Sequence, residues 1–113
     1  MINQTVQAIE ENIRQAKVIA GVGESLERLR LNRDFQTVIL NGYFKEEAIR
    51  LVHLKADPSM QSPDMQKSIV SQMDAIGSLN QYFTAVFQQA SIARKAIFSD
   101  EEARDEILAE GGN

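Results

Sequence analysis

The feature that most constrains this chain is a stretch of 26 residues, 68–93, which carries only one charged residue, Asp74. A helix on the surface of a soluble protein normally has a charged face, and a membrane-spanning helix needs about 20 mostly apolar residues. The stretch fits neither description, because it is rich in Gln, Ser, Thr and Asn. It therefore predicts a helix that protein surfaces cover on most sides.

The composition narrows the class of protein further. A chain of 113 residues is expected to form a single domain. It contains no cysteine, which excludes a disulfide scaffold, a thiolate nucleophile and a cysteine-ligated zinc ion. The net charge of −4 arises in residues 58–113, where four Lys and Arg stand against eight Asp and Glu. No basic stripe is present to neutralise phosphates, so we expect no nucleic-acid partner.

The first 31 residues have a heptad pattern. Small or apolar residues recur at alternating spacings of four and three, at Ile2, Val6, Ile9, Ile13, Ala16, Ala20 and Gly23. Polar flanks make this a narrow seam of the coiled-coil type, so residues 1–31 are predicted to form one long helix. We expect self-association through this seam, at Val6, Ile9, Ile13, Ala16 and Ala20.

The middle of the chain is predicted to contain two short helices, within residues 32–57, that separate at Asn41-Gly42. The same Asn-Gly pair would suit a β-hairpin, but the flanking residues do not alternate and helical sequence follows at once. Residues 58–62 form a linker, and Ser62-Pro63-Asp64 is a helix start signal.

One long central helix is then predicted over residues 63–98. Its expected core face comprises Ile69, Ile76, Leu79, Phe83, Val86, Ala90, Ala93 and Ile97. Ser99 and Glu102 resemble a capping box, which predicts a separate acidic helix and tail over 99–113. Together these elements predict an all-α protein, with long helices in an elongated helical hairpin or bundle and a coiled-coil-like N-terminal helix.

No set of residues predicts catalysis, a cofactor or a metal ion. His53 is the single histidine, and Asp57 is its nearest acid at helical spacing, which is too little for a metal site. Adjacent glutamates, as at Glu46-Glu47, point about 100° apart on a helix and cannot share a substrate atom. Arg28, Arg30 and Arg33 lie among acids, which favours salt bridges over an anion site. We therefore predict that the chain is not an enzyme.

A partner interface is predicted on the outer face of the charge-poor helix. Uncharged polar and aromatic residues outside the core suit an interface, since interface cores are depleted in charge. Met60 in the linker could add an adaptable contact. The predicted interface residues are Met60, Gln81, Tyr82, Thr84, Gln88 and Gln89.

Several segments between residues 26 and 83 resemble a group of small proteins encoded by tailed bacteriophages. The resemblance lies in Leu26-Glu27-Arg28-Leu29, Asn32-Arg33-Asp34-Phe35, Gly42-Tyr43-Phe44, Glu47-Ala48, Arg50-Leu51-Val52, Leu54-Lys55-Ala56-Asp57-Pro58 and Met73-Asp74-Ala75-Ile76-Gly77-Ser78-Leu79. It implies a virion component or an assembly factor, with no catalytic residues to transfer. Such genes tend to lie among those for head and tail proteins.

Residues and resemblance together predict a non-enzymatic phage protein that binds itself and other virion proteins. The alternative is a small phage regulator that inhibits a host protein, such as RNA polymerase or a defence enzyme, by placing its acidic tail in a basic channel. The N-terminus lacks a basic segment followed by a continuous apolar run, so we expect no signal peptide. The expected location is the virion or the cytoplasm of an infected bacterium, with no membrane partner.

Overall fold

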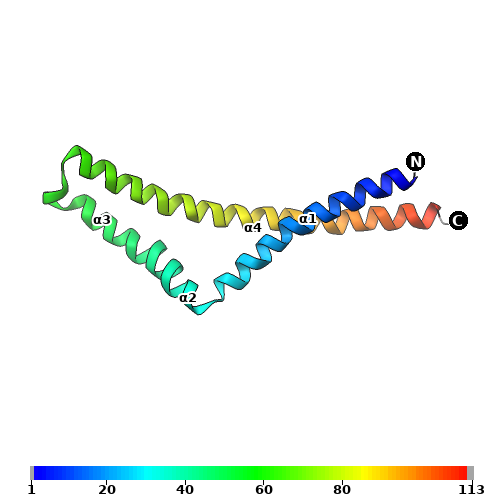
Figure 1. Ribbon diagram of the computed structural model, residues 1–113, viewed down its shortest axis with the longest axis horizontal. Helices are drawn as coiled ribbons and strands as arrows, with labels where there is room; N and C mark the ends of the chain where they lie inside the picture. Colours follow the sequence, from blue (N-terminus) through cyan, green and yellow to red (C-terminus); the bar gives the residue numbers. More distant parts are fainter. Residues whose placement is uncertain (1, 112–113) are drawn as a thin grey trace. The chain divides into compact units, whose positions relative to one another are not determined.

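A computed structural model describes residues 2–111, and every element it contains is a helix (Figure 1). The helices in chain order are α1 (Ile2–Arg30), α2 (Arg33–Phe35), the π-helix η1 (Gln36–Glu47), α3 (Ala48–Ala56), the short 3₁₀-helix η2 (Pro58–Met60) and α4 (Pro63–Gly111). The predicted all-α class is confirmed. The chain divides into two compact units: one combines residues up to Leu26 with those from Ala85 onward, and the other comprises Glu27–Thr84.

In the first unit, α1 packs antiparallel against the second half of α4. Ala16 and Ala20 form a buried cluster with Ala93, and Ile97 packs against it. Farther along the pair, Gly23 faces Ala90, and a side-chain carbon at Gly23 would lie 2.3 Å from the Ala90 Cβ. The two backbones approach this closely because the residues between them are Ala and Gly.

The second unit has a core of larger side chains. Leu51, Ile69 and Ile76 are buried together, and half-buried residues pack around them: Tyr43, Phe44, Ala48, Leu54, Met60 and Met73. Phe83 adds two aromatic contacts, with its ring centroid 5.9 Å from that of Phe35 and 5.6 Å from that of Phe44. The apolar side chains of η1 and α3 thus pack against the first half of α4.

The predicted break at Gly42 is wrong. Helical backbone continues from Arg33 to Ala56, with i→i+5 hydrogen bonding in η1. Half-buried residues recur there in four groups about four residues apart, at 35–36, 39–40, 42–44 and 47–48, and Phe35, Ile39, Phe44 and Ala48 belong to successive groups. This period exceeds the 3.6 residues of an α-helix and suits a π-helix, which has about 4.4 residues per turn. The wider turn keeps these four side chains on one face.

The predicted break before Ser99 is also wrong, because α4 continues without interruption to Gly111. Contacts with α1 extend to this end, where a side-chain carbon at Gly111 would lie 3.3 Å from Ile2 Cδ1. Packing against a neighbouring helix therefore overrides the local capping signal of Ser99 and Glu102. The start of α4 is as predicted, since Pro63 is its first residue and Ser62 Oγ accepts a hydrogen bond from the Met65 backbone N–H at 3.3 Å.

Replacing Gly23 by Ala tests the close approach of α1 and α4. The added methyl group has no room beside Ala90, so the helices must separate. We expect the free energy of unfolding to fall by about 1–2 kcal/mol, because overpacking outweighs the better helix propensity of Ala. Urea unfolding followed by circular dichroism measures the change.

Gly21→Ala is the matched control, because no atom lies within 4 Å of the position that a side-chain carbon would take at Gly21. This substitution should raise the free energy of unfolding by about 1 kcal/mol through helix propensity alone. Adding Ala90→Gly to the Gly23→Ala variant should restore part of the lost stability. Equal effects at the two glycines would contradict the close approach.

Candidate interaction surfaces

The predicted self-association seam is used within the chain. Val6, Ile13, Ala16 and Ala20 are buried and Ile9 is half-buried. Ala16 and Ala20 contact α4 of the same chain. Because α4 already covers these side chains, pairing two chains through the same seam would require α1 to leave α4. Self-association through this seam stays a prediction, and it would compete with the packing of α1 on α4.

An apolar groove follows one flank of the α1–α4 pair in the first unit. Its volume is about 320 Å³, and its lining contains no charged residue: Asn12, Gln15, Ala16, Ile19, Gln89, Ile92, Ala93 and Ala96. Ile19 is 43% exposed and Ile92 is 68% exposed, so the walls of the groove present large apolar side chains to solvent. Such side chains favour a protein contact.

Sequence reasoning missed Ile19 and Ile92. Both lie beside the seam positions and not on them, so a search for the core face excludes them. Positions that flank a heptad seam are often Glu or Lys. The signal that could have found Ile19 and Ile92 is that these two flanking positions are uncharged.

The predicted partner-interface residues divide between the two units. In the second unit Gln81, Tyr82 and Thr84 are exposed, although the Thr84 hydroxyl donates a hydrogen bond to the Asn80 backbone oxygen at 3.1 Å. In the first unit Gln88 and Gln89 are exposed, and Gln89 lines the apolar groove.

Met60 has a different environment from the one expected of an interface residue. It is half-buried and packs against the core cluster of Leu51, Ile69 and Ile76. The Gln66 side-chain amide donates hydrogen bonds to the Met60 oxygen at 2.8 Å and to the Lys55 oxygen at 3.0 Å. The linker is therefore held against α4, and Met60 contributes to the core.

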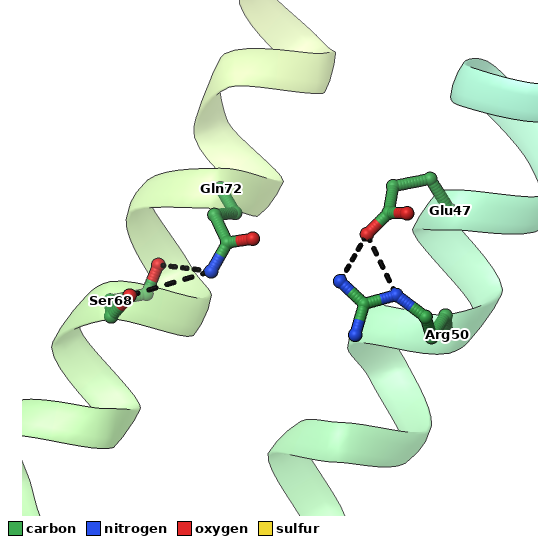
Figure 2. Close-up of polar contacts among 4 residues, drawn as sticks. All are labelled: Glu47, Arg50, Ser68 and Gln72. Atoms are coloured by element: carbon green, nitrogen blue, oxygen red, sulfur yellow. Dashed lines mark hydrogen bonds and ion pairs between the residues drawn. The ribbon is translucent and has the colours of Figure 1, made fainter.

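A second groove, of about 200 Å³, lies within the second unit and has a more polar lining: Tyr43, Glu47, Leu51, Gln72, Ala75 and Ile76. Figure 2 shows Glu47 and Gln72 on the two helices that border it. Arg50 Nε donates to Glu47 Oε1 at 2.9 Å, and the Gln72 amide donates to the Ser68 backbone oxygen at 3.3 Å. The hydrogen bond from Arg50 lowers the pKa of the Glu47 carboxyl group.

His53 and Asp57, the two residues considered as metal ligands, differ in their surroundings. His53 is exposed, while the Asp57 carboxylate accepts hydrogen bonds from the Ser59 backbone N–H at 2.8 Å and from its hydroxyl at 2.7 Å. The bond from the Ser59 N–H is the main cause of a lowered pKa at Asp57. Among residues 2–111, no group of three or more His, Cys, Asp or Glu side chains could hold a metal ion.

Some charged side chains elsewhere form local ion pairs. Arg30 lies 3.6 Å from the Glu27 carboxylate, in agreement with the predicted salt-bridged surface. Glu11 pairs with Arg14, whose hydrogen bond lowers the Glu11 pKa. At the end of α4, Arg104 pairs with Asp105 at 3.1 Å, and no basic residue lies in the last turn. This end therefore carries excess negative charge next to the negative pole of the helix.

Comparison with family models, with curated proteins and with solved structures found no match to this chain. Within residues 2–111, no helix has the length and apolar character needed to cross a membrane.

The Glu47–Arg50 contact predicts a specific pH dependence. Because the folded-state pKa of Glu47 is lowered, its ionised form stabilises the fold above the unfolded-state pKa of about 4.3. This contribution is lost as the pH falls through the folded-state pKa. Glu47→Gln should therefore lower the urea midpoint at pH 7, and the gap from the wild type should close in acid.

Glu46→Gln is the control, because it removes a neighbouring exposed carboxylate for which no ion pair is found within residues 2–111. Its urea midpoint should differ little from the wild type at either pH. A gap for Glu47→Gln that stays constant from neutral to acidic pH would contradict the contribution of the ion pair.

Proposed function

We propose that this protein is a non-enzymatic virion structural or assembly protein of a tailed bacteriophage, acting through helix–helix contacts and self-association. The observation that carries the proposal is the uncharged groove of the first unit, whose walls expose Ile19 and Ile92. A surface of this kind suits another protein surface better than water. The resemblance of residues 26–83 to small phage proteins supplies the biological setting.

The polar residues of α4 support the same proposal. Gln81 and Thr84 in the second unit, and Gln88 in the first, are exposed and uncharged. Amide and hydroxyl groups can donate and accept hydrogen bonds without the desolvation cost of a full charge. These positions suit contact with a second virion protein while the groove accepts a helix.

Quantitative mass spectrometry of purified phage particles and infected-cell lysate tests the proposed role. We expect many copies per particle for a structural component, or abundance in lysate with loss from mature particles for an assembly factor. Absence of particles after infection with a phage that lacks the gene would support either role. Normal yields of infectious particles from such a phage would contradict both.

The acidic end of α4 favours a second candidate function, a regulator that binds a basic channel of a host protein. Residues 100–110 contain six acids and one base, Arg104. This excess opposes the helix dipole, so it contributes nothing to the stability of the helix end. A basic partner would neutralise the excess of acids and offset their unfavourable position at the negative end of the helix dipole.

Charge removal distinguishes the regulator from the assembly protein. Deleting residues 99–113 is unsuitable, because this segment contacts α1. The better variant combines Glu102→Gln, Asp105→Asn and Glu106→Gln, which alters exposed side chains and keeps their size. Capture of a host protein by the wild type, and its loss in this variant, would support the regulator. Unchanged particle assembly with no host protein captured by either chain would argue against it.

A further inference from the structure

The two flanks of the α1–α4 pair differ in charge. In the heptad of the seam, most positions on one flank are charged: Glu10, Lys17 and Glu24 of α1 and Arg94 and Glu101 of α4, with Asn3 and Phe87 as the uncharged members. On the opposite flank lies the apolar groove, and its outer positions are Asn12, Gln15, Ile19, Gln89, Ile92 and Ala96. These six residues are called the neutral flank below. Both flanks of a solvent-exposed helix pair usually carry charge, so the neutral flank is exceptional.

The seam of the pair leaves apolar side chains uncovered. Its central residues are Ala16, Ala20, Gly23, Ala90 and Ala93, which bury little apolar area each. The larger side chains Ile19 and Ile92 lie outside the seam and stay exposed. A single pair of helices forms only one layer, whereas a stable helical domain normally has at least two. A second layer on the neutral flank would bury both isoleucines.

We propose that the neutral flank binds the neutral flank of a second copy of this chain, so that two α1–α4 pairs form an antiparallel four-helix bundle. This inference deepens the proposed function and rests on it, since it names the surface and the partner for self-association. The contact is isologous: the same surface of both copies meets across a two-fold axis perpendicular to the helices.

Charge favours a second copy as the occupant of the groove. A two-fold axis brings residues near their own counterparts, so a charged residue close to the axis would repel its copy. The groove lining has no charge, which makes it a surface where two chains of net charge −4 can meet without this repulsion.

The acidic end of α4 sets the direction of the contact. Residues 100–110 hold six acids and one base, and a parallel arrangement would place two such segments side by side. An antiparallel arrangement centred near Ile92 places them at opposite ends of the bundle. Like-charge repulsion is then reduced, since it falls with distance and is screened beyond about 10 Å at 0.1 M salt.

Single-cysteine variants of the full-length chain test the contact, because the natural sequence has no cysteine. Ile92→Cys places a thiol in the groove, and Phe98→Cys is the matched control. Both residues lie on α4 in the same unit and are 68% exposed, but Phe98 does not line the groove. A short, flexible bis-maleimide should convert most of the Ile92→Cys protein to a species of twice the 12.7 kDa chain mass. The control should stay mostly monomeric.

A charge substitution gives an independent readout of the same contact. Ile92→Asp should halve the mass measured by sedimentation equilibrium, whereas Phe98→Asp should leave it unchanged. Both positions are exposed, so circular dichroism should show that both variants keep their helices. The proposal is overturned if the wild type is monomeric at micromolar concentration, or if the Phe98 variants cross-link or dissociate as readily as the Ile92 variants.

The same data separate this inference from the proposed function. A wild-type chain that is monomeric in solution but abundant in phage particles would overturn the neutral-flank dimer and leave the virion role intact. A dimer that depends on Ile92, in a protein whose loss does not affect particle formation, would support the contact and overturn the role.

Discussion

The close approach of α1 and α4 at Gly23 and Ala90 is the constraint on which the first unit depends. Because a side-chain carbon at Gly23 would lie only 2.3 Å from the Ala90 Cβ, the backbones can meet only where side chains are minimal. Ala16, Ala20 and Ala93 continue this arrangement. This part of the interface buries little apolar area, although Val6, Ile13, Leu26 and Val86 are buried elsewhere in the unit, and Ile19 and Ile92 face solvent.

The second unit packs through larger side chains than the first. Its core contains Leu51, Ile69 and Ile76, surrounded by aromatic and methionine side chains. The π-helix η1 keeps Phe35 and Phe44 together against Phe83, which an α-helix with its shorter period would rotate apart. The wide turn of η1 thus places bulky residues on the face that meets α4. In α1, by contrast, small residues allow a close approach to α4.

Helical periodicity in the sequence predicted much of this fold, but local signals for helix ends predicted two breaks that the structure does not have. Most of the expected core face of α4 is buried, at Ile69, Ile76, Val86, Ala90 and Ala93, whereas Leu79, Phe83 and Ile97 are half-buried. Gly42 and Ser99 have the local chemistry of helix ends, yet tertiary contacts carry the helix through both. Ile19 and Ile92 were missed because a groove between two helices depends on their crossing geometry, which one helix pattern does not contain.

The first unit has an uncharged apolar groove, and the proposed role of the chain is to cover this groove with another copy. The most direct measurement is the thermal unfolding midpoint of the wild-type chain over a hundredfold range of protein concentration. If folding and association are coupled, the midpoint rises with concentration by mass action. A midpoint that is independent of concentration, together with a mass of 12.7 kDa throughout, would contradict this account.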